Sequence, residues 1–388
     1  MSILFVVNKG KICISIQAQN AAEFFDKIAR ARPLADIVEA RFDSLPEAEL
    51  KVVLSEIFTK PEKISGRILA TFRPGEEGGF RTLTLDERLA FWNSGITEMV
   101  WGIDLEIDIA KKIQFRKRPK IICSHHDFEK VPDDPAVIYE KLRASGADIL
   151  KIAARIDDAS DAVPLWKLVD ISSRDGMPIV PIAMGEAGKW TRILGNAYGS
   201  PFTYAALDTG DAAAPGQIDA EEMDSIYRIK SHTRATSVFG LLAGDTAYSL
   251  SPFIHNAAFD EAGMDAVFVP FQTGRIDTFF RRFLRPETRE IDINFKGFAV
   301  TNPLKRDVIP HLHGIDDAAS AIGAVNTVAV TEKGFWGYNT DAQGFIEPLK
   351  AACGEIKGAR AAIIGNGGAA RAVIYALKAQ GAETTVLG

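Results

Sequence analysis

The chain has 388 residues, a formal net charge of −6, 47% hydrophobic and 25% charged residues, which is typical of a globular protein with two or three domains. The negative charge and the lack of a basic stripe argue against nucleic acid as a partner, and no apolar run approaches the roughly 20 residues of a membrane span. Three scattered cysteines, Cys13, Cys123 and Cys353, lack metal-ligand spacing and indicate reduced thiols in a cytoplasmic protein.

The first 230 residues alternate short apolar runs with amphipathic stretches. The runs predicted as strands are 12–17, 36–41, 67–72, 99–105, 120–124, 149–153, 178–184 and 202–207, and helical patterns include 21–32, 83–94, 136–145 and 163–173. Repeated strand–helix units imply a parallel sheet with right-handed crossovers, and eight of them match a closed (β/α)8 barrel. An open doubly wound sheet could be built from the same units, so the barrel prediction rests on the count.

Polar residues follow or close most of these strands. They are Glu39 and Arg41 at the second strand, Arg73 and Glu77 after the third, His126 after the fifth, Lys151 near the end of the sixth, Arg192 after the seventh and Gln217 after the eighth. In a barrel of this kind the chemistry lies at the carboxyl ends of the strands and in the loops that follow. We therefore expect these side chains to converge on one rim.

Lys151 is the most informative of them, because it lies in the apolar run 149–153. A buried ammonium must be paired or lose its proton, and a neutral buried lysine is the kind that attacks a ketone and forms a Schiff base. The alternative is a lysine at a strand end that pairs with a carboxylate or reaches water.

The pattern changes after about residue 232. A strand at 237–242 leads into a polar loop and a helix at about 252–262, and a further strand–helix–strand series passes through 267–270 and 297–300. An apolar strand at 361–364 then runs into Gly365-Asn366-Gly367-Gly368-Ala369-Ala370-Arg371 and a helix. This fits the G-x-G-x-x-A dinucleotide fingerprint at its proper strand-to-helix turn, where glycines let the backbone approach a pyrophosphate.

Several histidines have more than one interpretation. Spacing alone does not choose between His126 and its neighbour His125. His311 and His313 have ligand-like spacing but no cysteine or carboxylate cluster beside them, so no metal site is predicted there.

Two further pairs remain open. Asp104 and Glu106 alternate along the fourth strand and face one interior side, so they could bind a metal, but pairing with barrel cations is the expectation. Ser249 and Ser251 could simply cap the helix that follows them.

The first half resembles type I 3-dehydroquinate dehydratases over nearly its whole length. The matching stretches are Glu39-Ala40-Arg41-Phe42-Asp43, Thr71-Phe72-Arg73 with Glu77-Gly78-Gly79, His126-Asp127-Phe128, Lys151-Ile152-Ala153, Met184-Gly185 with Arg192, and Pro215-Gly216-Gln217. The second half resembles shikimate dehydrogenases. There the matches are Ser249-Leu250-Ser251-Pro252, Val300-Thr301-Asn302-Pro303-Leu304-Lys305, Gly323-Ala324-Val325-Asn326-Thr327, Gly337-Tyr338-Asn339-Thr340-Asp341-Ala342 and the Gly365–Arg371 turn. Together the halves resemble the bifunctional fusion of the shikimate pathway.

The dehydratase resemblance implies that Lys151 forms an imine with the ketone of 3-dehydroquinate, with no cofactor. His126 would act as general base and then as general acid, and Glu77 would orient it. Arg192 would bind the substrate carboxylate with its planar fork. Glu39, Arg41, Arg73 and Gln217 would hold ring hydroxyls and the carboxylate. A separate hypothesis is that Arg41 and Arg73 help to keep Lys151 neutral.

The dehydrogenase resemblance implies NADP(H)-dependent reduction of 3-dehydroshikimate to shikimate. Lys305 would donate a proton, and Asp341 would hold Lys305 and a substrate hydroxyl. Residues implied to contact substrate are Ser249, Ser251, Thr301 and Asn326, and those implied to contact cofactor are Gly365, Asn366, Gly367, Gly368 and Ala369. Ala299 departs from the polar residue often found at its position, which puts one ring contact in doubt.

We expect three domains: a dehydratase barrel at 1–232, a shikimate dehydrogenase substrate domain at 233–336 and an incomplete NADP-binding Rossmann domain at 337–388. Only two strands and one helix of the last domain are expected before Gly388, so a C-terminal truncation with an impaired reductase is predicted.

Three other functions compete with this interpretation: a quinate- or shikimate-degrading enzyme, a class I aldolase-like barrel, and a catalytically silent metabolite sensor. The retained Lys151 and His126 argue against the sensor.

Overall fold

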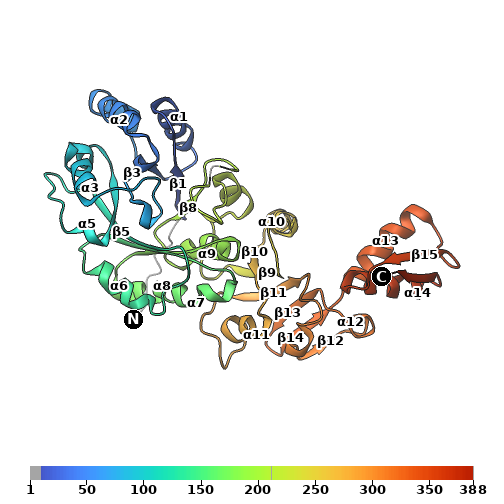
Figure 1. Cartoon of the computed structure of the whole chain (residues 1–388). Coiled ribbons are helices and arrows are strands. Elements are labelled where there is room, and N and C mark those ends of the chain that lie inside the picture. Colours follow the sequence, from blue (N-terminus) through green and yellow to red (C-terminus); the bar gives the residue numbers. More distant parts are fainter. Residues whose placement is uncertain (1–9, 211, 388) are drawn as a thin grey trace. The chain divides into compact units, whose positions relative to one another are not determined.

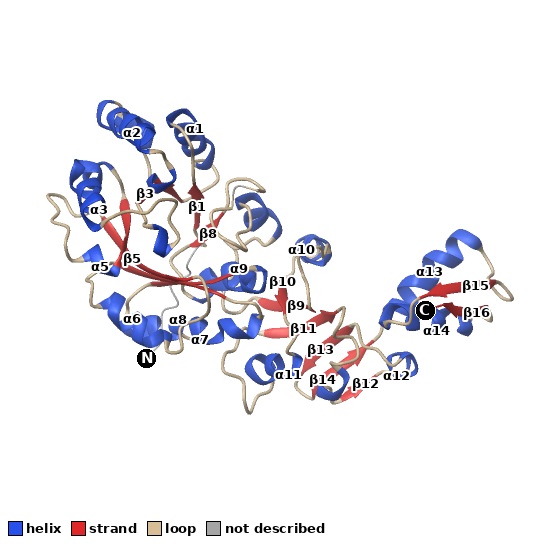
Figure 2. Cartoon of the chain, viewed as in Figure 1, coloured by secondary structure: helices blue, strands red, loops and turns tan. Residues whose placement is uncertain are grey.

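The computed structural model describes residues 10–210 and 212–387, and the chain divides into two compact units, Met1–Thr236 and Ser237–Gly388. The first unit is an eight-stranded parallel sheet with the strand order β7-β6-β5-β4-β3-β2-β1-β8, curved into a barrel (Figures 1 and 2). Its strands are β1 (Ile12–Ile16), β2 (Ile37–Arg41), β3 (Ile68–Thr71), β4 (Gly102–Glu106), β5 (Lys120–Asp127), β6 (Ile149–Arg155), β7 (Ile179–Met184) and β8 (Thr203–Ala205). The predicted barrel class is confirmed.

Helices follow the strands and cover the outside of the barrel (Figure 2). They are α1 (Ala21–Ala31), α2 (Glu47–Thr59), α3 (Leu85–Phe91), α4 (Thr97–Met99), α5 (Ile107–Ala110), α6 (Pro135–Arg143), α7 (Val163–Trp166), α8 (Leu168–Asp175) and α9 (Lys189–Tyr198). Local sequence explains several ends. Thr84 and Glu87 form a reciprocal capping box that begins α3, and Asn20 caps α1. Gly176, in the left-handed conformation, ends α8.

Four predictions about the first unit need correction. The helix predicted over 163–173 is divided into α7 and α8, and the one predicted over 83–94 ends at Phe91, before a turn in which Gly95 has a φ of 99°. The strand β5 runs to Asp127, so His126 lies inside it and not after it. Lys151 is the third of the seven residues of β6, so it lies in the first half of its strand and not near the end.

The second unit contains a six-stranded mixed sheet with the order β10-β9-β11-β13-β14-β12. Its strands are β9 (Ser237–Ala243), β10 (Ala266–Gln272), β11 (Phe295–Val300), β12 (Gly314–Ile315), β13 (Thr327–Thr331) and β14 (Gly334–Tyr338), and its helices are α10 (Ser251–Glu261), α11 (Ile276–Phe279) and α12 (Asp317–Ile322). The strands β9, β10 and β11 are parallel, as predicted. The hairpin of β13 and β14 is antiparallel and pairs with β11, which the predicted strand–helix–strand series did not include.

The last part of this unit has a small parallel sheet of β15 (Arg360–Ile364) and β16 (Glu383–Leu387), flanked by α13 (Asp341–Cys353) and α14 (Gly368–Ala379). Buried residues of the two helices, including Ile346, Ala372 and Leu377, form its core with Ile363. This strand–helix–strand arrangement is the one predicted around the glycine-rich turn.

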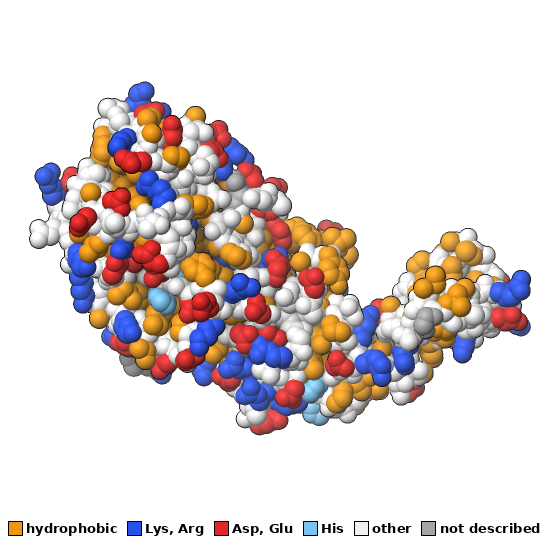
Figure 3. Space-filling view, in the orientation of Figure 1, with side chains coloured by type: hydrophobic (Ala, Val, Ile, Leu, Met, Phe, Trp, Pro, Cys, Tyr) orange, Lys and Arg blue, Asp and Glu red, His pale blue; other side chains and the backbone are white. Residues whose placement is uncertain are grey.

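On the face that Figure 3 shows, side chains of both charge signs are interspersed over the first unit. Among the described residues, no helix combines the length and apolar character that a membrane span requires. The same residues contain no group of three or more His, Cys, Asp or Glu placed to hold a metal ion.

Candidate active sites

The interior of the barrel changes from apolar to polar between successive layers. Residues i and i+2 of a strand point to the same side of the sheet. On several strands an apolar interior residue is followed, two positions later, by a polar interior residue. The pairs are Cys13 and Ser15 on β1, Ile37 and Glu39 on β2, Leu69 and Thr71 on β3, Ile122 and Ser124 on β5, and Ile149 and Lys151 on β6. The first member of each pair belongs to one buried cluster, and the second lies nearer the carboxyl end, where the polar side chains gather.

Lys151 lies within this polar layer and is only 5% exposed. Its Nζ is 3.0 Å from Oδ2 of Asp104 and 3.9 Å from Oε1 of Glu39, and it stands 4.4 Å from the ring centroid of Tyr204. Of the two forms of the alternative, a lysine that reaches water is wrong, and a lysine that pairs with a carboxylate is what the structure shows. The amine lies inside the barrel, and its closest charged contacts are carboxylates. The contact of Lys151 with Asp104 argues against the hypothesis that Arg41 and Arg73 help to keep Lys151 neutral.

Asp104 links the lysine to Arg73, which follows β3. Nη2 of Arg73 is 2.8 Å from Asp104 Oδ2, and its Nε is 3.3 Å from Glu106 Oε1. Burial opposes ionisation of Asp104, but Arg73 and Lys151 outweigh it and lower the pKa of this carboxyl to about 2. Asp104 and Glu106 therefore pair with barrel cations, as expected, and Asp104 remains ionised at neutral pH.

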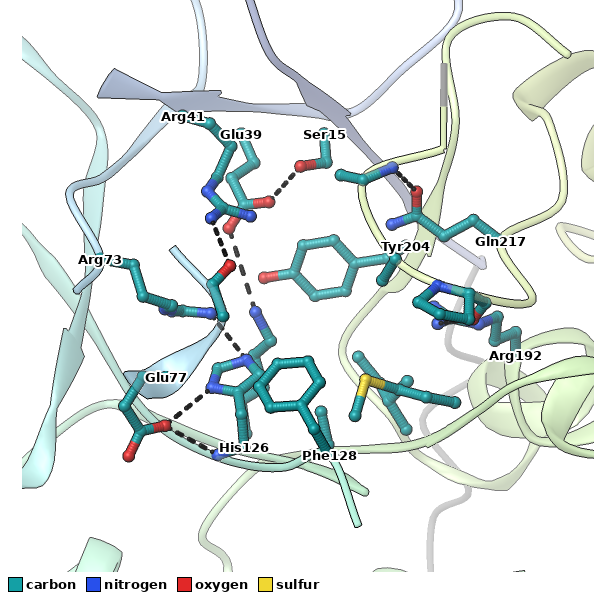
Figure 4. Close-up of a pocket in the computed structure, with 18 residues that line it drawn as sticks. Ser15, Glu39, Arg41, Arg73, Glu77, His126, Phe128, Arg192, Tyr204 and Gln217 are labelled. Atoms are coloured by element: carbon teal, nitrogen blue, oxygen red, sulfur yellow. Dashed lines mark hydrogen bonds and ion pairs between the residues drawn. The ribbon is translucent and has the colours of Figure 1, made fainter. Parts of the chain in front are cut away.

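His126 is held between an arginine and a glutamate (Figure 4). Its Nε2 is 2.6 Å from Nη1 of Arg73, and its Nδ1 is 3.2 Å from Oε2 of Glu77, which also accepts the backbone N–H of His126 at 3.0 Å. Because a guanidinium can only donate, Nε2 is the acceptor and the ring proton belongs on Nδ1. Burial, followed by the charge of Arg73, lowers the pKa of His126, so the imidazole is neutral.

The glutamate partner has a shifted pKa of its own. Burial raises the pKa of Glu77 to about 7, against the lowering influence of Arg73. Glu77 belongs to the short helix η3 (Gly75–Glu77), which is followed by Gly78 with a φ of 83°. His125 is 3.9 Å from the other oxygen of Glu77 and does not line the cavity described below, so the geometry favours His126 over His125.

Arg192 and Arg41 are both buried, but they differ in their partners. Arg41 makes a two-pronged pair with Asp43, at 3.0 and 2.7 Å. The Nε and Nη1 atoms of Arg192 have no hydrogen-bond partner among the described residues, and its Nη2 is 3.5 Å from the carbonyl oxygen of Pro215. Burial lowers the pKa of Arg192 to about 10. Arg192 therefore presents an uncompensated cation to the cavity, which suits an anionic ligand.

These side chains surround one cavity of about 520 Å³, a volume that includes its open mouth. The cavity is lined by Ser15, Glu39, Arg41, Arg73, Glu77, Gly78, His126, Phe128, Lys151, Ala153, Ile182, Met184, Arg192, Tyr204, Ala213, Ala214, Pro215 and Gln217. All eight residues predicted for the dehydratase site are among them. Gln217 accepts the backbone N–H of Ala213 at 2.8 Å, which closes its loop over the cavity.

The second unit brings three of its predicted residues together. Nζ of Lys305 is 2.5 Å from Oδ2 of Asp341, and Nδ2 of Asn326 donates to Oδ1 of the same carboxylate at 2.7 Å. Asn339 accepts the backbone N–H of Asp341 at 3.1 Å and so orients the first residue of α13. A lysine whose proton is shared with a carboxylate can serve as a proton donor at this point.

The remaining predicted residues of this unit are less closely joined. The hydroxyl of Ser249 accepts the backbone N–H of Ser251 at 3.2 Å, but the N-cap residue of α10 is Leu250 and it makes no side-chain capping hydrogen bond, so the alternative that the two serines cap this helix is not confirmed. No hydrogen bond between described residues joins Ser249, Ser251 or Thr301 to Lys305 or Asp341.

The glycine-rich turn connects β15 to α14. Gly365 has a φ of 99°, and a Cβ at Gly365 or Gly367 would meet no heavy atom within 4 Å. A Cβ at Gly368 would lie 3.0 Å from Cδ of Lys305, so the turn adjoins the lysine. The open backbone at the start of the 12-residue helix α14 suits an approaching phosphate.

Comparison with known proteins decides the family. A model of the type I 3-dehydroquinase family matches residues 12–234, and one of the shikimate dehydrogenase substrate-binding domain matches residues 241–328. The chain belongs to the type I 3-dehydroquinase family. It joins the dehydroquinase unit to a shikimate dehydrogenase substrate-binding domain, as the sequence predicted.

Two relatives align over almost the whole chain. The chloroplastic bifunctional 3-dehydroquinate dehydratase/shikimate dehydrogenase of Arabidopsis thaliana is 27% identical over 98% of this chain and 65% of the relative. The shikimate biosynthesis protein AroDE of Chlamydia pneumoniae is 27% identical over 96% of this chain and 75% of the relative. The chain thus spans about two thirds of the Arabidopsis relative. Among solved structures, a type I 3-dehydroquinate dehydratase from Clostridium difficile is 26% identical, with a TM-score of 0.50, over 57% of this chain and 91% of that one.

The dehydroquinase unit also has residues in the cavity, Ser15 and Tyr204, and one behind it, Thr71, that the sequence predictions did not include. Ser15 donates to Glu39 at 2.5 Å, and Thr71 donates to the other oxygen of Glu39 at 2.8 Å. Tyr204 lies beside Lys151. The signal that could have found Ser15 and Thr71 is their place two residues after an interior apolar residue. Tyr204 has the same place after Phe202, but an aromatic residue in an apolar run is interpreted as part of the core.

Proposed function

We propose that the first unit converts 3-dehydroquinate to 3-dehydroshikimate through an imine on Lys151, and that the second unit takes part in NADPH-dependent reduction of 3-dehydroshikimate to shikimate. The observation that supports the first part most strongly is a buried amine, a neutral imidazole and an unpaired guanidinium around one cavity. These three groups match the ketone, the acidic C–H bond and the carboxylate of the substrate.

The chemistry would begin with the carboxylate of the substrate on Arg192, where an ion pair would compensate the buried charge. Lys151 would pass a proton to Asp104 or to solvent, attack the ketone carbon and lose water to give an iminium. The iminium makes the neighbouring C–H bond acidic, because it accepts the electron pair that this bond leaves behind. No step of this reaction needs a cofactor.

His126 would carry out the proton transfers of the elimination. Its Nε2 lone pair, now bound to Arg73, must turn to the substrate to accept the carbon-bound proton. The imidazolium would be stabilised by Glu77 at Nδ1, and it would then give its proton to the departing hydroxyl group. Hydrolysis of the product iminium would release 3-dehydroshikimate and regenerate Lys151.

In the second unit, Lys305 would protonate the ketone oxygen and Asp341 would hold Lys305 in place through the 2.5 Å contact. NADPH would supply the hydride, and the turn of Gly365, Gly367 and Gly368 fits its phosphates, because the backbone there is open. Asn326 supports the carboxylate of Asp341 and faces the same site. We also propose the three-domain division 1–232, 233–336 and 337–388, whose first boundary lies close to the division between the two compact units.

Turnover of 3-dehydroquinate by the full 388-residue chain, followed by the absorbance of the conjugated product, tests the dehydratase. Lys151→Ala should abolish turnover, while Lys141→Ala, at an exposed lysine of α6, should leave it unchanged. Full turnover by Lys151→Ala would contradict the imine. Binding of 3-dehydroquinate with no turnover by the native chain would favour the metabolite sensor. Oxidation of NADPH in the presence of 3-dehydroshikimate tests the second unit and the prediction of an impaired reductase.

A further inference from the structure

Tyr204 on β8 is a cavity residue to which the chemistry above gives no part. Its ring centroid is 4.4 Å from Nζ of Lys151, and the whole residue is only 2% exposed. Figure 4 shows its hydroxyl group pointing from β8 into the centre of the cavity, toward the side where Glu39 and Arg41 lie. The hydroxyl is therefore placed where a ketone attacked by Lys151 would lie.

The hydroxyl of Tyr204 has no hydrogen-bond partner among the described residues. A buried phenol normally finds a partner, because a buried polar group without one destabilises the fold. The neighbouring polar groups are already engaged: Glu39 accepts from Ser15 and Thr71, and Asp104 accepts from Lys151. The unpartnered hydroxyl and the unpaired Arg192 are thus two groups of one cavity whose partners a ligand can supply.

A purely structural role would not need the oxygen atom. The ring packs against Phe202 at 5.4 Å between centroids and belongs to the apolar cluster of the barrel interior, and a phenylalanine would make these contacts equally well. Burial raises the pKa of Tyr204 well above its ordinary value, so the group remains a protonated donor at neutral pH.

We propose that Tyr204 is a further catalytic residue, whose hydroxyl donates a hydrogen bond to the substrate oxygen on the carbon that Lys151 attacks. This inference rests on the proposed dehydratase function. As the C–N bond forms, the π electrons of the C=O bond move to that oxygen, which takes up the proton that the nitrogen loses. The C–O bond then breaks, and the oxygen leaves as water with a second proton from solvent. Tyr204 holds the oxygen through both steps and keeps its own proton.

Rapid quenching with borohydride measures imine formation directly. The full chain is mixed with 3-dehydroquinate, quenched at increasing times, and the fraction of Lys151 carrying the reduced adduct is measured by mass. Tyr204→Phe should slow adduct formation by about a hundredfold to a thousandfold, the range expected for loss of one donor to a developing oxyanion. Its affinity for a cyclic carboxylate that lacks an oxygen at the attacked carbon should equal that of the native chain.

Tyr139→Phe is the matched control, because Tyr139 is equally buried in the same unit but donates to Asp175 outside the cavity. It should form the adduct at the native rate. Tyr204→Phe removes an atom without a partner, so its unfolding temperature should match or exceed that of the native chain. An adduct rate for Tyr204→Phe within twofold of the native rate would overturn the role of Tyr204 alone. No adduct in the native chain would overturn the proposed function and this inference together.

Discussion

Arg192→Met should make the protein more stable and a worse enzyme. The fall in the pKa of Arg192 from 12.5 to about 10 means that keeping the buried side chain charged costs about 3 kcal/mol. The folded-state pKa lies below the unfolded value, so this cost is fully present below about pH 10 and is relieved only as the pH rises toward 12.5. At pH 7 the substitution by a flexible apolar side chain should therefore stabilise the unit by about 1–3 kcal/mol.

The same substitution removes the proposed partner of the substrate carboxylate. One or two charge-assisted hydrogen bonds contribute about 1.5–3 kcal/mol each, so the KM for 3-dehydroquinate should rise by about 10²-fold or more. Calorimetric unfolding at pH 7 should show a rise of roughly 2–4 °C for each kcal/mol gained by a unit of this size.

Arg41→Met is the matched control, because Arg41 is equally buried but paired with Asp43, which is 0% exposed. Removing Arg41 leaves that carboxylate without its cation and should destabilise the unit by about 3–5 kcal/mol. If Arg192→Met lowered the unfolding temperature as much as Arg41→Met does, the reasoning that Arg192 lacks a counter-charge would be refuted.

Three other predictions concern groups beside the two reaction centres. Because the pKa of Glu77 is raised to about 7, the folded state loses stability as the pH rises from about 4.5 to 7. Glu77→Gln should therefore be more stable than the native chain at pH 8, and the pH profile of its kcat/KM should lack an ionisation near pH 7. An unchanged pH profile would assign that ionisation to another group. Gly78→Ala places a Cβ 2.2 Å from the ring of Phe128 and should reduce the rate of dehydration. The control is Gly66→Ala, which is also at positive φ but has no heavy atom within 4 Å, and it should show only a stability loss of about 1–2 kcal/mol by thermal unfolding. Equal dehydration rates for the two variants would argue against a clash between residue 78 and Phe128. Asp341→Asn should lower the NADPH-dependent rate but cost at most about 1 kcal/mol in calorimetric stability, because its side chain is 30% exposed; an unaffected rate would remove Asp341 from the site.

The barrel could be predicted because the apolar residues of its strands and of its helices recur with different periods. The site could be predicted because polar residues in such a barrel gather at the ends of the strands. The interior pairs such as Ile149 and Lys151 carry both signals. Period alone could not place His126 inside β5, because a strand that continues past its apolar part reads as a loop. The contact of Lys151 with Asp104 joins β6 and β4, which are not neighbours in the sheet, and the curvature of the barrel brings their side chains together.

The second unit was predicted less completely. Its parallel strands and the glycine-rich turn were found, but the antiparallel hairpin at Thr327–Thr331 and Gly334–Tyr338 was not, because alternation along a strand does not reveal the direction of its partner. The contact between Lys305 and Asp341 was expected from the family resemblance, and the structure places the two groups 2.5 Å apart. Nothing in the spacing of 36 residues between them would have shown this.

The proposed dehydration requires the amine of Lys151 to bond covalently to the substrate, and reductive trapping detects that bond. The full chain is incubated with 3-dehydroquinate and borohydride, digested, and the peptide that contains residue 151 is weighed. This peptide should gain the mass of the reduced adduct, and dehydration should stop in proportion. Continued dehydration with an unmodified Lys151, or an adduct on another lysine, would contradict the proposed role of Lys151.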